Sequence, residues 1–206
     1  MEEFNPMQFA NPNGEEGERL TTHMNSHHKD LTDWGLNNLF ISNTDVCLDI
    51  GCGGGYTASE LCKNAKKVMA VDISPVCVNA TINNNIDYIN SGKLQVLEAN
   101  AKKLPFEKET INIVTAVETL YFWQDTLVCF QEINRVLKKG GTFLIIMETY
   151  ATEDRREYNL DLKSRFDYFN IFTPEQLEIY LKDCGFSDVM VVIHPTNYWI
   201  AVYATK

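Results

Sequence analysis

Short apolar runs alternate with amphipathic stretches along most of the chain. After residue 40, these runs predict strands at about 45–50, 67–72, 93–98, 110–117 and 141–148, and the stretches between them have helical periodicity. Ser74-Pro75 predicts the start of one helix, because serine caps helices and proline fits the first turn. Two more alternating segments, at about 187–193 and 198–205, predict strands that end the chain. Strands that alternate with helices indicate a parallel sheet with helices on both faces.

The first 40 residues follow a different pattern. Residues 1 to about 18 are rich in turn formers and charge, so we expect no core there, whereas scattered apolar side chains from about 19 to 40 predict helical pieces. Residues 149–172 carry many charges and aromatic rings. We expect both segments to fold over the strand ends as a substrate lid. We therefore divide the chain into an N-terminal extension (1–40) and one α/β domain (41–206).

The end of the first predicted strand is the most informative segment. Asp49 is followed by three glycines at alternate positions, Gly51, Gly53 and Gly55. Glycine is used where the backbone needs a positive φ or where a ligand approaches closely. Asp72 ends the second predicted strand, where a carboxylate can accept both hydroxyls of a ribose. The pattern therefore predicts a site for a ribose-containing ligand.

Two classes of cofactor use this geometry. The dinucleotide fingerprint G-x-G-x-x-G/A fails for Gly51 and Gly53, because Tyr56 occupies the third position, although Gly53-x-Gly55-x-x-Ala58 fits it. Asp49 would repel a pyrophosphate and could help to hold an ammonium group. S-adenosylmethionine has an amino-acid end, a ribose and no phosphate, so the pattern favours it over NAD, and a nicotinamide dehydrogenase is the rival interpretation.

With these features, the chain from about residue 30 to 206 resembles the class I S-adenosylmethionine-dependent methyltransferases. Segments 94–106, 111–120 and 135–146 are similar to the family's third strand, its fourth strand, and its helix, glycine turn and fifth strand. The resemblance implies a Rossmann-like, doubly wound seven-stranded sheet in the order 3-2-1-4-5-7-6 with an antiparallel last strand. It also implies a set of cofactor-binding residues: Asp49, Gly51, Gly53, Gly55, Asp72, Ile73, Asn100, Ala101 and Val117. Asn100 stands where the family usually has Asp for the adenine amino group, and its carbonyl oxygen can still accept that hydrogen bond.

Ligands of doubly wound sheets bind beyond the carboxyl ends of the strands. Glu118 and Tyr121 follow the fourth predicted strand, and Glu148 and Tyr150 follow the fifth. We select Glu118 and Tyr121 as catalytic candidates, each as either a proton acceptor or a wall of the acceptor pocket.

Three histidines lie in the N-terminal extension. His23 and His27 are one helical turn apart and His28 follows directly, but H-E-x-x-H is absent and no carboxylate or thiol lies nearby at ligand spacing. We therefore expect no metal site and interpret the three as a surface histidine cluster, with a role in a substrate lid as the second interpretation.

Composition narrows the possible partners. The net charge of −10 and the pI near 4.8 disfavour the phosphate contacts that bind nucleic acids, and they disfavour anionic membranes. The six cysteines include no C-x-x-C, and the N-terminus lacks a basic region followed by an apolar one. These features favour reduced thiols and a cytoplasmic protein, which we expect to be a monomer or homodimer.

Together, the residues and the resemblance predict transfer of a methyl group from S-adenosylmethionine to a small-molecule acceptor. Two alternatives remain: a nucleic-acid or protein methyltransferase, and a non-catalytic cofactor-binding protein of the same fold. A base methyltransferase usually carries N-P-P-Y or D-P-P-Y after the fourth strand, where this chain has Val117-Glu118-Thr119-Leu120.

Overall fold

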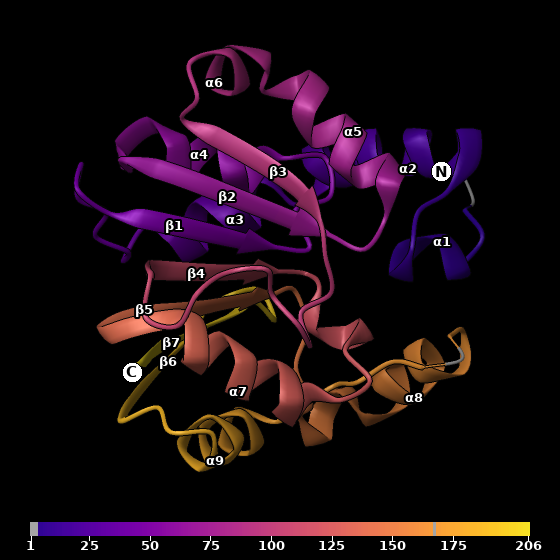
Figure 1. The fold of residues 1–206 in the computed structure, drawn as a ribbon. Helices are drawn as coiled ribbons and strands as arrows, with labels where there is room; N and C mark the ends of the chain where they lie inside the picture. The colour runs from indigo at the N-terminus through magenta and orange to yellow at the C-terminus, as the bar shows by residue number, and fades with distance from the viewer. Residues whose placement is uncertain (1–3, 167) are drawn as a thin grey trace.

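The computed structural model describes residues 4–166 and 168–206, in which seven strands form one sheet (Figure 1). The order is β3-β2-β1-β4-β5-β7-β6. Neighbours among β1 to β5 pair in parallel, and β7 pairs antiparallel with both β5 and β6. The predicted sheet is therefore confirmed in order and direction. The strands are β1 (Val46–Ile50), β2 (Lys67–Asp72), β3 (Leu94–Glu98), β4 (Ile111–Val117), β5 (Leu137–Met147), β6 (Asp188–Ile193) and β7 (Ile200–Thr205).

Helices cover both faces of this sheet. On one face α7 packs on β5 and α9 on β6, and on the other face α4 packs on β1 and β2 and α3 on β5. Helix α5 contacts β2 and β3, and Ser74 caps it by accepting a hydrogen bond from the Cys77 N–H, as predicted. The α-helices are α1 (Met7–Ala10), α2 (Gly14–His27), α3 (Lys29–Leu36), α4 (Tyr56–Asn64), α5 (Pro75–Asn84), α6 (Ile86–Asn90), α7 (Thr126–Val136), α8 (Arg156–Ser164) and α9 (Pro174–Asp183), and the 3-10 helices are η1 (Leu120–Phe122) and η2 (Glu153–Arg155).

Alternate side chains of each central strand enter different cores. In β1, Leu48 packs with the α7 side of the sheet and Cys47 packs with Leu61 and Cys62 of α4. Leu48 and Leu61 are fully buried. Full burial of a leucine side chain stabilises the folded state by about 1.5–3 kcal/mol. The two cores fix β1 in the centre of the sheet, which sets the position of the glycine loop that follows it.

The N-terminal residues are more ordered than the sequence predicted. We expected no core before about residue 18, but α1 and α2 begin earlier, and α2 packs on α5. Pro12 and Gly17 are buried, and the Ser74 hydroxyl donates a hydrogen bond to the Pro12 carbonyl. The expectation was wrong because α2 and the loop before it are held by α5, a partner far along the chain. Figure 1 shows α1, α2 and α8 at the end of the sheet toward which the arrowheads of β1, β2 and β3 point.

In the described part of the chain, no helix is both long enough and apolar enough to cross a membrane.

Candidate active site

The loop between β1 and α4 has the backbone that its glycines predict. Gly51, Gly53 and Gly55 all have positive φ, at 72°, 52° and 85°, a region that other residues rarely adopt. A Cβ on Gly51 would lie 2.3 Å from the Thr119 hydroxyl, whereas a Cβ on Gly53 would meet no atom within 4 Å. The loop is therefore tight against the segment that follows β4 on one side and open on the other.

The open side of the loop faces a cavity of about 320 Å³ at the carboxyl ends of β1, β2, β3 and β4. This volume falls at the lower end of the range for small-molecule sites. The predicted cofactor residues that line it are Gly51, Gly53, Asp72, Ile73, Asn100, Ala101 and Val117, and the catalytic candidate Glu118 lines it as well. The structure thus brings together residues from four strand ends.

Asp72 is fixed in the cavity wall by two backbone amides. Its two carboxylate oxygens accept hydrogen bonds from the Gly53 N–H at 3.0 Å and the Ser74 N–H at 2.9 Å. Burial raises the pKa of this carboxyl, and the backbone hydrogen bonds oppose the rise. Each carboxylate oxygen has a second lone pair, so Asp72 can still accept hydrogen bonds from two ligand hydroxyls.

Asp49 and Gly55 do not line the cavity. Asp49 is buried in β1, next in sequence to Ile50, which lines the cavity, and its Oδ1 accepts a hydrogen bond of 2.8 Å from the Thr115 hydroxyl. Its Oδ2 is buried without a hydrogen-bond partner. Burial raises the pKa of Asp49 to about 7, the Thr115 hydrogen bond opposes the rise, and the charge of Asp72 adds to it. An unsatisfied carboxylate oxygen in a strand whose end lines the cavity fits a cationic ligand group that is held directly or through water.

The proposed adenine end of the cavity has one exposed apolar side chain. Ile73 is 44% exposed although it follows a buried strand, so it projects from the β2–α5 loop instead of packing in the core. The side-chain oxygen Oδ1 of Asn100 accepts a hydrogen bond from the Lys102 N–H at 2.9 Å. This bond leaves one lone pair of Oδ1 for a ligand.

Several cavity walls were missed by the sequence analysis. Phe9 and Pro12 reach the cavity from the N-terminal segment, and Phe122 and Trp123 reach it from the segment after β4. Phe9 also contacts Phe166, which follows α8, with ring centroids 6.2 Å apart. The two segments predicted as a lid therefore meet each other beside the cavity. No motif marked these residues, because their contacts depend on packing between distant segments.

Glu118 lies between the cavity and the histidines. Its Oε1 accepts hydrogen bonds from the Tyr121 hydroxyl at 3.1 Å and from the Glu148 N–H, and its Oε2 lies 3.8 Å from the His28 Nε2. Burial, together with the charge of Glu148, raises its pKa. Glu118 also has a positive φ of 56°, and such backbone strain concentrates at functional sites.

Tyr121 does not line the cavity, but its hydroxyl donates a hydrogen bond to Glu118, which does. Its ring stacks on Phe169 with centroids 4.8 Å apart, and its hydroxyl accepts a hydrogen bond from the Thr149 N–H while it donates to Glu118. Burial and the charge of Glu118 raise the pKa of Tyr121 far above neutrality. A tyrosine in this setting remains protonated, so it can position Glu118 but is unsuited to accept a proton.

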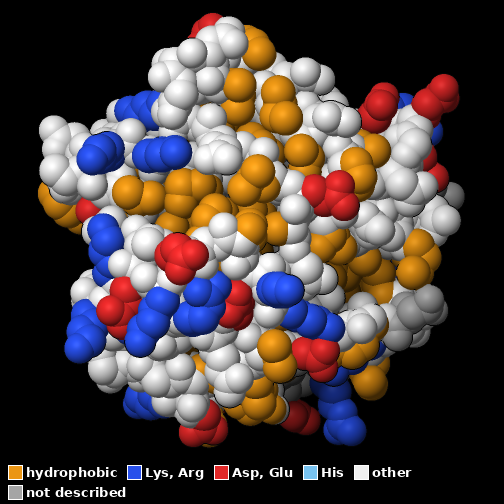
Figure 2. All heavy atoms as spheres, viewed as in Figure 1, with side chains coloured by type: hydrophobic (Ala, Val, Ile, Leu, Met, Phe, Trp, Pro, Cys, Tyr) orange, Lys and Arg blue, Asp and Glu red, His pale blue; other side chains and the backbone are white. Residues whose placement is uncertain are grey.

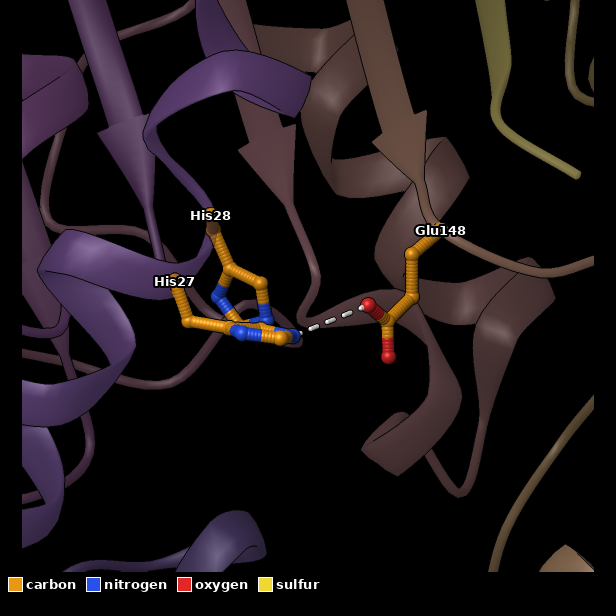
Figure 3. A group of neighbouring side chains, drawn as sticks. All are labelled: His27, His28 and Glu148. Atoms are coloured by element: carbon orange, nitrogen blue, oxygen red, sulfur yellow. Dashed lines mark ion pairs between the residues drawn. The ribbon is translucent and has the colours of Figure 1, made fainter. Parts of the chain in front are cut away.

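The structure brings a carboxylate to the histidines that the sequence left without one. His27 ends α2, His28 follows it, and both point toward Glu148 after β5 (Figure 3). The His27 Nε2 lies 3.6 Å from the Glu148 Oε2. Burial and the neighbouring histidines lower the pKa of His28 to about 4, so it is neutral at neutral pH. Sequence spacing missed this group because Glu148 comes from a strand that is distant along the chain.

Comparison with known proteins gives a consistent result. Residues 48–145 match a family model described as a methyltransferase domain. The chain is 29% identical over 154 residues to the sterol 4-C-methyltransferase of Caenorhabditis elegans. This match covers 73% of this chain but only 43% of that protein.

Two solved structures have similar folds. A SAM dependent methyltransferase from Aquifex aeolicus matches with a TM-score of 0.72 at 19% identity, over 91% of this chain and 97% of that one. The geranyl diphosphate C-methyltransferase of Streptomyces coelicolor, in complex with Mg²⁺, geranyl diphosphate and S-adenosyl-L-homocysteine, matches with a TM-score of 0.77 at 14% identity, over 97% and 87% of the two chains. At these identities, the likeness shows the fold.

Proposed function

The chain belongs to the class I S-adenosylmethionine-dependent methyltransferases, and from this premise we propose that it transfers a methyl group from that cofactor to a small-molecule acceptor. The observation that carries the proposal is the cavity beside the open glycine loop, with Asp72 fixed in its wall and the unsatisfied oxygen of Asp49 buried in the adjoining strand β1. The cavity suits a ligand that has a ribose and a cationic end.

S-adenosylmethionine is the cofactor typical of the family, and it supplies an activated methyl carbon when bound. Asp72 would accept the ribose hydroxyls, and Asp49 would hold the ammonium end directly or through water. Ile73 would flank the adenine, and the remaining lone pair of Asn100 would accept from its amino group. Gly53 leaves the backbone open to the ligand, which is the physical reason for a glycine at that position.

Glu118 is the residue best placed to accept a proton from the acceptor. It lines the cofactor cavity and also a second, smaller cavity that His28 lines. Its Oε1 is held by Tyr121 and the Glu148 N–H, so its Oε2 is the oxygen left for an acceptor group. A carboxylate held in this way removes a proton without having to reorient, which is the condition for effective general-base catalysis. Tyr121 is a positioning residue in this scheme.

The enclosed site and the charge of the chain favour a small acceptor. Helices α1 and α2 and the segment that contains Phe166 and Phe169 surround the strand ends, and we propose that they form the substrate lid predicted for 1–40 and 149–172. Figure 2 shows Lys and Arg side chains over the region of α7 and β5 interspersed with Asp and Glu. With a net charge of −10, such a face offers weak electrostatic attraction to nucleic acid.

The proposed setting is the cytoplasm. All six cysteines are free, and five of them are buried, as in proteins kept under reducing conditions. We keep a monomer or homodimer as the proposed state of assembly.

The test combines a binding measurement with a turnover measurement. Calorimetric titration with S-adenosylmethionine should show one saturable site, and incubation with fractionated metabolites should release S-adenosylhomocysteine from at least one fraction. Binding without turnover in any fraction would favour the non-catalytic alternative. Saturable binding of NAD in place of S-adenosylmethionine would overturn the choice of cofactor, and turnover only on added RNA, DNA or protein would overturn the acceptor class.

A further inference from the structure

We propose that His27, His28 and Glu148 form a binding site for one divalent transition-metal ion of the Zn²⁺ class, between the N-terminal helices and the carboxyl end of β5. No metal-ligand spacing marks these residues in the sequence, because Glu148 joins the two histidines only where the fold brings the end of α2 to the end of β5. Its existence does not depend on the proposed methyl transfer.

The positions of the ligand atoms support this proposal. One ligand atom from each of the three side chains lies within 4.8 Å of the other two, and the His27 Nε2 and Glu148 Oε2 are 3.6 Å apart. Ligand atoms about 2.0–2.2 Å from a tetrahedral ion lie about 3.3–3.6 Å from one another, so small side-chain rotations bring all three into range. Figure 3 shows the two imidazoles and the carboxylate directed into one space.

The electrostatics of the cluster also favour a cation. Two carboxyl groups lie beside the two imidazoles: the Glu118 Oε2 is 3.8 Å from the His28 Nε2, and the Glu148 Oε2 is 3.6 Å from the His27 Nε2. An ion at this position would place positive charge beside both carboxyl groups.

The donor set and its exposure indicate the kind of ion. Two imidazoles and one carboxylate suit Zn²⁺, Co²⁺ or Fe²⁺ better than Mg²⁺ or Ca²⁺, which prefer oxygen. The side chains of His27 and Glu148 are 57% and 41% exposed, which gives an ion access from solvent. Three protein ligands leave a coordination position for water. On the premise of the proposed function, an oxygen atom of the acceptor could take that position, because His28 and Glu118 line one small cavity beside Gly51 and Gly53.

The test is titration of full-length, untagged protein with Co²⁺, followed by visible absorption and by competition with Zn²⁺. We expect one ion per chain, and we expect His27→Ala, His28→Asn and Glu148→Gln each to weaken binding at least tenfold, which is the scale of loss even for groups that only support ligands. Circular dichroism checks that each variant is folded. His27→Ala and Glu148→Gln alter exposed side chains, so these two keep the test valid if His28→Asn fails to fold.

Two other histidines supply matched controls. His194 lies outside the group and packs against Trp34 and Trp199, so His194→Gln should retain the affinity of the unaltered protein. His23 stacks on His27 but is not in the group, so His23→Ala should change the affinity less than threefold.

Three results would overturn the proposal: no saturable Co²⁺ binding, equal binding by all the variants, or a loss in His23→Ala as large as that in His28→Asn. Titration of the same samples with S-adenosylmethionine keeps this outcome separate from that of the proposed function.

Discussion

Asp49→Asn should make the protein more stable at high pH relative to the unaltered chain. Asp49 is buried, one of its oxygens has no partner, and its pKa is raised from 3.8 to about 7, chiefly by burial. Between these two values the folded protein holds a proton that the unfolded chain has lost. The stability of the unaltered protein therefore falls as the pH rises through this interval and levels off above about pH 7. Asparagine keeps the shape and has no charge to bury.

The magnitude follows from the shift in pKa. A rise from 3.8 to about 7 corresponds to about 4 kcal/mol at about 1.4 kcal/mol per unit. Roughly 2–3 kcal/mol of this develops between about pH 5 and about pH 8. For a chain of this size, about 1 kcal/mol shifts the Tm by roughly 2–4 °C. The Tm of Asp49→Asn minus that of the unaltered protein should therefore increase by about 5–10 °C over that range.

The assay is thermal unfolding of both proteins at a series of pH values, without cofactor. The new amide group is buried without a partner and costs about 1–3 kcal/mol, but this cost is the same at every pH, so only the change of the difference with pH is diagnostic. A difference in Tm that stays constant from about pH 5 to about pH 8 would refute the reasoning.

A second measurement on the same variant separates ligand binding from stability. Because Asp49 is proposed to hold the cofactor ammonium, the affinity of the unaltered protein for S-adenosylmethionine should rise with pH up to about 7 and then level off. Asp49→Asn should bind more weakly and without this dependence. Higher stability combined with weaker binding would exclude general misfolding as the cause.

Three further predictions concern the walls of the cavity. Asp72→Ala should weaken S-adenosylmethionine binding by about 1–3 kcal/mol, the usual value of hydrogen bonds to a charged group, and an unchanged dissociation constant would remove Asp72 from the site. Deletion of residues 1–12 should weaken cofactor binding at least tenfold in a protein that still folds, because Phe9 and Pro12 line the cavity; unchanged affinity would show that this segment is not a wall. Glu118→Gln should lower kcat by about 10²–10⁴ if a proton must be removed, while cofactor affinity changes little, and Tyr121→Phe should lower kcat less and leave KM unaltered. Full turnover by Glu118→Gln would exclude Glu118 as the proton acceptor.

The fold and the cofactor end of the site could be predicted from the sequence because they depend on local patterns. Alternating apolar runs predicted the strands, and the glycine spacing after Asp49 predicted the positive φ of Gly51, Gly53 and Gly55. Asp72 was predicted from its place at the end of a strand. In parallel sheets, such strand ends always meet at one edge, so chain order was enough to bring these residues together.

The tertiary structure decided what lies opposite that edge. The burial of α2 on α5, the contact between Phe9 and Phe166, and the hydrogen bond from the Glu148 N–H to Glu118 all join segments through packing. Sequence spacing showed His27 and His28 without a carboxylate, and the fold brought Glu148 to them. Periodicity and motif spacing record only neighbours along the chain, whereas these contacts depend on how helices of no distinctive sequence dock on the sheet.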